Sequence, residues 1–309
     1  MSRPATPFSS TPFSSSAFAS TLASQLAGWP VRDNTALDSL FYDVDALTRD
    51  ERRQLAAREK PEGIILEVGP SYAPSLRIWP GIEACDCLRD DYAALTVAGV
   101  GSSAVGAAAL ARNVADALDA PVLGVVSGLG LADLGSEALG GFFLFGGLNA
   151  IRHAGTPFEA WHWLAPPMLR PRDPGHTFRM ARESADVRAI RELLGDGGVK
   201  VPYLVGHSKG NLVLSEALYA LREADRQGFR KAAADMRVVT FSARIAMPRE
   251  LTCVTDVMGE LDTFGALNSR PDIPVDVSVP AAWHHTNTRL PFHLPVTKVL
   301  GQIARRPGG

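Results

Sequence analysis

The chain has 309 residues, of which 46% are hydrophobic and 21% charged, so a mostly disordered protein is excluded and one large α/β domain is expected. Its 31 basic and 33 acidic side chains leave a net charge of −2, and no overall field favours nucleic acid or an anionic membrane. We therefore expect a small or uncharged partner and no nucleic acid.

Residues 1–30 are rich in Ser, Thr, Pro and Phe and are predicted to form a disordered tail. They lack the basic start and continuous apolar stretch of a secretory signal. Cys85 and Cys87 are too close for the usual structural bridge, which also favours a reducing, cytoplasmic location. No apolar stretch reaches the ~20 residues of a transmembrane helix, although transient contact with a lipid surface is compatible with the sequence.

Residues 31–94 are predicted to form an N-terminal extension of helices and a hairpin. Apolar residues spaced through 37–47, followed by Arg- and Glu-rich sequence, predict one amphipathic helix or two short ones, which Pro61 ends. Residues 64–69 and 75–79 have the composition of short strands around a Gly-Pro turn and predict an edge hairpin. The sequence assigns no function to this extension.

From residue 95 to residue 309, apolar runs alternate with glycine turns and helical segments. This alternation is typical of buried parallel strands joined by crossover helices. The strands are expected at 95–100, 121–126, 201–205, 237–241, 251–257 and 275–280, and helices at 104–118 and 211–223. The pattern predicts an α/β fold with a doubly wound, mostly parallel sheet and helices on both faces.

A long insertion at about 128–173 separates the second and third of these strands. Its first half is apolar and Gly-rich, and its second half is aromatic and Pro-rich. Connections of this length are usually functional or disordered. We expect the insertion either to form a lid over an apolar cleft or to pack into the core, and its composition favours a hydrophobic substrate.

The motif Gly206-His207-Ser208-Lys209-Gly210 lies between a predicted strand and a predicted helix. Acyl transfer through serine requires a hydroxyl held away from its own backbone, which a strained strand-to-helix turn supplies. Glycines on either side let the backbone approach neighbouring elements closely. Because both flanks agree with this geometry, Ser208 is predicted to be a nucleophile, with a structural turn serine as the alternative.

Two backbone donors are expected to bind the oxyanion that forms when Ser208 attacks. The helix start after the serine predicts the N–H of Lys209 as one donor. The ammonium group of Lys209 is expected in solvent, with contact to an anionic substrate group as the alternative. The second donor is expected in the glycine-rich loop after the first parallel strand, where Val100, Gly101 and Ser102 are all candidates.

The same loop also matches a dinucleotide-binding fingerprint through Gly99, Gly101 and Ala104. That hypothesis requires an acidic residue at the end of the next strand to bind the ribose. Residues 121–127 contain none. A dinucleotide is therefore the weaker alternative, and no cofactor or metal is predicted.

The general base is expected after both the serine and the acid, which is the chain order of α/β-hydrolases. His284 and His285 follow the apolar run 275–280, at a strand end where catalytic loops are found. Either of them is predicted to be the base. His293 has the surroundings of a packed or lid histidine.

The candidate acids between the serine and this histidine pair are Asp256, Asp262, Asp272 and Asp276. Asp262 follows a strand-like segment, so its carboxylate is expected at the carboxyl edge of the sheet, where it would orient the imidazole. Asp256 is the second choice. Asp272 lies in a turn and is expected to be a solvated loop residue, and Asp276 also precedes the base.

Five stretches resemble the core of class 3-type lipases and related α/β-hydrolases: Val205 to Asn211, Val239 to Ala243, Gly259 to Asp262, Val279-Pro280 and Trp283 to Asn287. The resemblance covers about residues 95–300 and implies an α/β-hydrolase fold. It also implies a triad of Ser208, Asp262 and either His284 or His285. Three departures are Ser242 in place of the usual glycine, a short spacing from acid to base, and Ala98-Gly99 where the family has His-Gly. These departures bear on the substrate class that the resemblance implies more than on the triad that it implies.

The predicted function is hydrolysis of a carboxylic ester, lipid-like or otherwise hydrophobic, through an acyl-enzyme. The alternative from another class is a non-catalytic binding or scaffold protein on a hydrolase fold. In that case residues 1–60 would dock a partner.

Overall fold

The computed structural model describes residues 34–57, 62–85, 91–99, 102–127, 184–195 and 198–306. The chain divides into two units, Met1–Pro30 and Val31–Gly309, and every described residue belongs to the second. The predicted tail at 1–30 and the predicted insertion at 128–173 lie outside the described residues.

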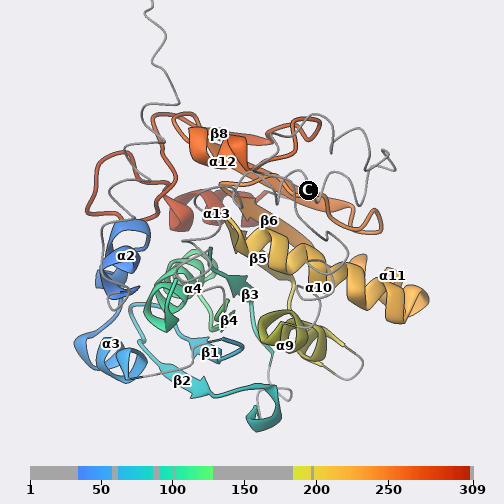
Figure 1. The fold of residues 1–309 in the computed structure, drawn as a ribbon, viewed down its shortest axis with the longest axis horizontal. Coiled ribbons are helices and arrows are strands. Elements are labelled where there is room, and N and C mark those ends of the chain that lie inside the picture. Colours follow the sequence, from blue (N-terminus) through green and yellow to red (C-terminus); the bar gives the residue numbers. More distant parts are fainter. Residues whose placement is uncertain are drawn as a thin grey trace, which may run out of the picture. The chain divides into compact units, whose positions relative to one another are not determined.

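In the described part of the chain, eight strands form one sheet in the order β2-β1-β4-β3-β5-β6-β7-β8 (Figure 1). β1 pairs antiparallel with β2 and β4, and all the other neighbours are parallel. The strands are β1 (Ile65–Val68), β2 (Leu76–Trp79), β3 (Ala94–Val97), β4 (Val122–Val125), β5 (Tyr203–His207), β6 (Arg237–Phe241), β7 (Cys253–Gly259) and β8 (Val277–Val279). The predicted mostly parallel sheet and the edge hairpin are confirmed.

The strand order reverses at β3. The chain passes from β3 to β4 on one side and later returns to β5 on the other side of β3. In open α/β sheets, ligands bind beyond the carboxyl ends of strands at such a switch point, because the two following loops diverge and leave space between them. The loops after β3 and β5 are therefore where a site is expected.

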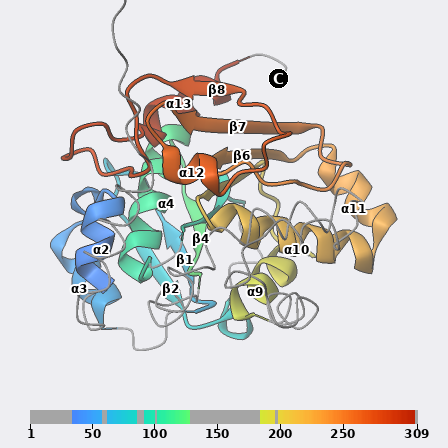
Figure 2. The ribbon, with the colours of Figure 1, turned by 45° about the horizontal axis from the view of Figure 1, so that its top comes forward.

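Helices cover both faces of the sheet (Figure 2). α4 and α13 pack on one face, with α2 and α3 against α4, while α9, α10 and α11 pack on the other. The helices are α2 (Asn34–Phe41), α3 (Arg49–Ala56), α4 (Ala104–Leu118), α9 (Ala185–Leu194), α10 (Gly210–Ala224), α11 (Arg226–Ala233), α12 (Thr263–Leu267) and α13 (Val296–Ala304), with 3-10 turns η1 (Val44–Ala46) and η2 (Ile82–Ala84).

Side chains of the central strands are buried on both faces. Leu204 packs into the core under α10, whereas its neighbour Val205 packs into the core under α4. Val238 and Val239 on β6 divide between the two cores in the same way. Alternate side chains of one strand thus enter different cores, which is why the strands are continuous apolar runs in the sequence.

The N-terminal extension forms two short helices, α2 and α3, and not one long one. A capping box begins α3: the N–H of Glu51 donates to Thr48 Oγ1 at 3.2 Å, and the N–H of Thr48 donates to Glu51 Oε2 at 2.8 Å. The other carboxylate oxygen of Glu51 pairs with Arg112 on α4, and both side chains are buried. This buried ion pair joins the extension to α4, which packs on the sheet.

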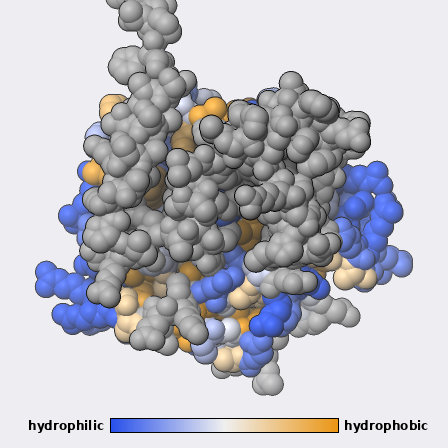
Figure 3. All heavy atoms as spheres, in the orientation of Figure 1, coloured by the Kyte–Doolittle hydropathy of each residue, from blue (hydrophilic) through white to orange (hydrophobic). Residues whose placement is uncertain are grey.

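Hydrophilic residues cover the sides of the molecule where α3 and α11 lie (Figure 3). Both helices are amphipathic and bury only a few residues, such as Leu55 on α3 and Phe229 on α11.

Within the described ranges, no helix is both long and apolar enough to cross a membrane.

The cysteines differ from the sequence-based expectation. Cys85 belongs to a disulfide bond, whereas Cys253 on β7 is a free thiol. The expectation that no bridge forms was therefore wrong for Cys85. The cysteines therefore no longer favour a reducing location.

Candidate active site

Ser208 lies in the turn between β5 and α10 and has a backbone φ of +53°. This left-handed conformation costs a residue with a Cβ roughly 1–3 kcal/mol and persists only where surrounding contacts fix it. One such contact is the N–H of Ser208, which donates to the carbonyl oxygen of Phe241 at 2.8 Å. The turn lifts the hydroxyl away from its own backbone, as the motif predicts.

Glycines allow this turn to approach its neighbours. A Cβ on Gly206 would lie 2.1 Å from Asn211 Oδ1, and one on Gly210 would lie 2.2 Å from the carbonyl oxygen of Val97. A Cβ on Gly99, after β3, would lie 2.9 Å from the Cβ of Ser208. The expected close approach is confirmed, and the loop after β3 packs directly on the serine.

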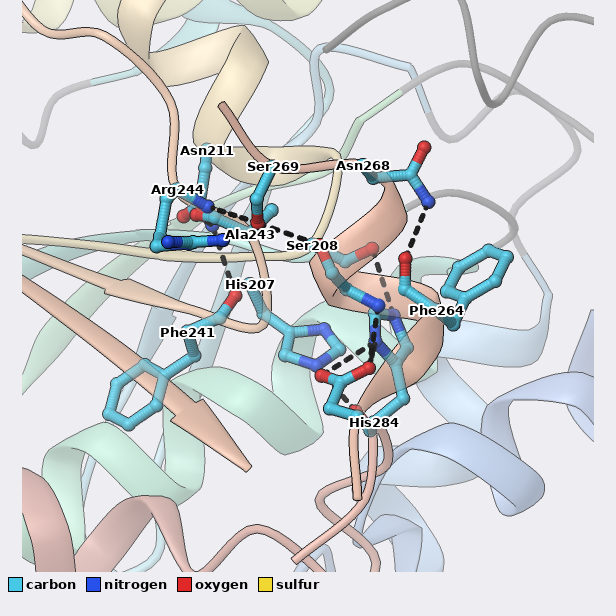
Figure 4. A network of polar contacts seen from close by, with 12 residues as sticks. His207, Ser208, Asn211, Phe241, Ala243, Arg244, Phe264, Asn268, Ser269 and His284 are labelled. Carbon is cyan, nitrogen blue, oxygen red and sulfur yellow. Dashed lines mark hydrogen bonds and ion pairs between the residues drawn. The ribbon is translucent and has the colours of Figure 1, made fainter. Parts of the chain in front are cut away.

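A hydrogen-bonded chain joins Ser208, His284 and Asp262 (Figure 4). His284 Nε2 lies 3.0 Å from Ser208 Oγ, and His284 Nδ1 lies 2.9 Å and 3.0 Å from the two carboxylate oxygens of Asp262. Because an ionised carboxylate only accepts, Nδ1 carries the proton and donates to Asp262. Nε2 is then the acceptor for the serine hydroxyl.

Asp262 follows β7 and caps the start of α12. The N–H of Gly265 donates to its Oδ1 at 2.6 Å. Burial alone would raise the pKa of Asp262, but attraction to His284 and the hydrogen bonds to its carboxylate outweigh burial, so its pKa lies below the usual value. Asp262 therefore stays ionised and fixes the orientation of the imidazole.

Of the two candidate histidines, the structure brings only His284 to the serine. His285 Nε2 lies 3.0 Å from the carbonyl oxygen of Pro291, and its ring packs edge-on against Trp283. His293 Nδ1 lies 3.3 Å from the carbonyl oxygen of Leu290. Both belong to the packing of the loop after β8.

The other aspartates have different partners. Asp256 on β7 accepts a hydrogen bond from the hydroxyl of Thr240 on β6, and burial raises its pKa to about 6. The N–H of Asp256 donates to Asp276 at 2.8 Å. Asp272 forms an ion pair with Arg270 and is exposed, as expected for a loop residue.

The predicted oxyanion donors are only partly described. Val100 and Gly101 lie outside the described residues. Ser102 directs its N–H (3.3 Å) and its hydroxyl (2.8 Å) at the carbonyl oxygen of Gly99, so both donors are engaged within the loop. Lys209 follows the serine at the start of α10, as predicted. Lys209 is buried, so the expectation that its ammonium group lies in solvent was wrong.

Sequence reasoning missed two residues of the N-terminal extension that reach the site. Tyr42, after α2, accepts a hydrogen bond from the N–H of Gly99 at 2.6 Å and contacts His207 Nδ1 at 3.0 Å. Asp38 on α2 accepts from the N–H of Ser103 at 3.0 Å. The sequence does contain a signal for them: Asp38 and Tyr42 are four residues apart, so a helical spacing places both polar groups on the same, buried side of this segment.

No group of three or more His, Cys, Asp or Glu side chains among the described residues has the arrangement of a metal site.

Comparisons with models of protein families, with curated proteins and with solved structures found no match to this chain. Its function is therefore argued from the geometry of Ser208, His284 and Asp262.

Proposed function

We propose that this chain is a serine hydrolase with an α/β-hydrolase fold and that it cleaves a carboxylic ester through an acyl-enzyme. The observation that carries this proposal is the hydrogen-bonded chain from Ser208 Oγ through His284 to Asp262. Its position at the switch point of a parallel sheet, with the serine at a positive φ, matches the nucleophile elbow of such enzymes.

The proposed reaction has two halves. His284 Nε2 takes the proton of Ser208 as Oγ attacks the ester carbonyl, and the imidazolium then protonates the leaving alkoxide, so the C–O bond breaks and an alcohol departs. Water next attacks the acyl-enzyme with His284 again as base, which releases the acid and restores the serine. Asp262 remains ionised throughout and stabilises the imidazolium.

Two backbone groups would bind the oxyanion. One is the N–H of Lys209, which lies at the positive end of the 15-residue helix α10. The other would come from Val100 or Gly101, because the preceding Gly99 already packs against the serine. Ser102 is left out of this role because the carbonyl of Gly99 takes both of its donors.

A hydrophobic ester fits the apolar residues around the acid. Leu261 and Leu267, on either side of the α12 turn, are 47% and 52% exposed. The ring of Phe264 packs edge-on to His284 with centroids 4.7 Å apart (Figure 4). An apolar ring beside the catalytic histidine, with exposed leucines in the same segment, favours a substrate whose acyl or alcohol part is hydrocarbon-like.

The dinucleotide alternative is disfavoured by Asp38. A pyrophosphate would bind at the N-terminus of α4. The carboxylate of Asp38 already lies there and accepts from both the N–H and the hydroxyl of Ser103. A second anion at this position would be repelled.

A series of chromogenic esters and thioesters of graded acyl length tests the proposal. We expect hydrolysis by the wild type and a loss of at least about a thousandfold in Ser208→Ala. Ser215→Ala is the matched control and should keep most of the activity. Ser215 is likewise a buried serine, but it lies on α10 and donates to the carbonyl of Ala246. Equal rates in Ser208→Ala and the wild type would contradict the proposal.

A further inference from the structure

A second chain of hydrogen bonds meets the chain of Ser208, His284 and Asp262 at the backbone of His284. It joins the N–H of Gly99 to the hydroxyl of Tyr42 (2.6 Å), that hydroxyl to His207 Nδ1 (3.0 Å), and His207 Nε2 to the carbonyl oxygen of His284 (2.8 Å). Tyr42 and His207 are both buried. The chain therefore crosses the interior from the loop after β3 to the backbone of the residue that contacts Ser208.

The direction of every bond in this chain is fixed. A backbone N–H only donates, so Tyr42 accepts from Gly99 and gives its own O–H to His207 Nδ1. A carbonyl oxygen only accepts, so His207 Nε2 carries the ring proton and donates to His284. Burial, together with the neighbouring His284, lowers the pKa of His207 to about 3, so its ring stays neutral and Nδ1 remains an acceptor.

The two ends of this chain lie beside the reacting groups. Gly99 directly precedes the loop from which the second oxyanion donor would come, and the other end is the backbone of His284 itself. α2 also fixes the same two loops at neighbouring points: Asp38 binds Ser103, and the carbonyl of Phe41 accepts from the N–H of Thr286 at 2.7 Å.

We propose that Tyr42 and His207 are positioning residues that hold the loop after β3 and the backbone of His284 in register with Ser208. This inference rests on the proposed hydrolase function. The N-terminal extension then contributes to the site, because Tyr42 binds the N–H of Gly99 directly and the backbone of His284 through His207.

The test measures how fast the 309-residue chain is labelled by a fluorophosphonate, separating the saturating rate from the half-saturating probe concentration. Tyr42→Phe removes both hydrogen bonds of the hydroxyl. It should lower the saturating rate at least about tenfold and change the half-saturating concentration by less than about threefold. Tyr92→Phe is the matched control: Tyr92 is equally buried and donates to Glu67 at 3.0 Å, away from Ser208. It should be labelled at the wild-type rate.

Two variants of His207 separate its two bonds. Glutamine places an amide nitrogen near the position of Nε2 and keeps the bond to His284, whereas asparagine places an amide oxygen near the position of Nδ1 and keeps only the bond to Tyr42. We expect both variants to slow labelling, His207→Asn by about tenfold and His207→Gln by less, because glutamine keeps the bond to the backbone of His284. If Tyr42→Phe fails to fold, the comparison of His207→Gln with His207→Asn still tests the positioning role.

Wild-type labelling at Ser208 with unchanged rates in Tyr42→Phe and His207→Asn would overturn this inference and leave the hydrolase proposal standing. Equal losses in Tyr92→Phe and Tyr42→Phe would also overturn it, because the loss would then reflect general destabilisation. A wild type that is not labelled at all would overturn both proposals.

Discussion

His284 Nε2 lies 3.0 Å from Ser208 Oγ, although 76 positions separate the two residues in the chain. The contact arises because β5 and β8 run parallel in one sheet, so the loops that follow them leave from the same edge. Because β6 and β7 lie between them, the loop after β8 reaches back over the ends of two strands to bring His284 to the serine turn.

The two candidate acids can be separated by matched substitutions. Asp262→Asn should lower ester hydrolysis by about 10³–10⁴-fold, because an amide in this position favours the wrong tautomer of His284. Asp256→Asn should retain activity within about threefold, since Asp256 contacts Thr240 and not the histidine. Steady-state rates on one ester check both. Comparable losses in the two variants would contradict the assignment of the acid.

The two adjacent histidines can likewise be distinguished by matched substitutions. His284→Gln should reduce activity by at least about a thousandfold, because no base remains beside the serine hydroxyl. His285→Gln should cost stability but little activity, since its ring serves the contacts to Pro291 and Trp283. Activity per folded molecule, with folding followed by circular dichroism, distinguishes them. The reverse ranking would assign the base to His285.

The strands, both long helices and the turn that carries Ser208 could be predicted because these depend on local pattern. It could not choose between His284 and His285, because neighbouring side chains of an irregular loop point in directions that no periodicity fixes. Tyr42 was missed for another reason: its partners Gly99 and His207 lie 57 and 165 positions away, and only the assembled sheet brings them together.

Asp256 should make stability depend on pH. Its folded pKa of about 6, raised by burial and by nearby Asp276, lies above the ordinary value of 3.8, so the folded state binds the proton more tightly than the unfolded state. The resulting stabilisation is present below pH ~4 and is lost as the pH rises through ~6. Asp256→Asn has no carboxyl to ionise, so it does not lose this stabilisation at high pH. We expect the Tm of the variant minus that of the wild type to be larger at pH 7.5 than at pH 4 by roughly 2–6 °C.

Melting curves of Asp256→Asn and the wild type in matched buffers measure this difference. Asparagine keeps an oxygen that accepts from Thr240, so the comparison isolates the charge. The same Tm difference at both pH values would show that the Asp256 carboxyl does not titrate as its buried position implies.

Gly210 should tolerate no side chain. A Cβ there would lie 2.2 Å from the carbonyl oxygen of Val97, and backbone atoms of β3 cannot move aside cheaply. Gly210→Ala should therefore lower the free energy of unfolding by about 3 kcal/mol or more and abolish activity. Gly301→Ala on α13 is the control: its nearest neighbour is the flexible Arg305 side chain at 3.3 Å, so it should be neutral or stabilising by up to ~1 kcal/mol. Urea unfolding compares the two, and an equally small effect of both would contradict the tight elbow.

The central claim is that Ser208 is a nucleophile activated by His284. Treating the chain with a fluorophosphonate and locating the adduct by peptide mass spectrometry tests it most directly, because Oγ displaces fluoride from phosphorus only when a neighbouring base accepts its proton. We predict a single adduct on Ser208, absent from Ser208→Ala and formed far more slowly in His284→Gln. No adduct on Ser208, or equal labelling of the wild type and Ser208→Ala, would contradict the claim.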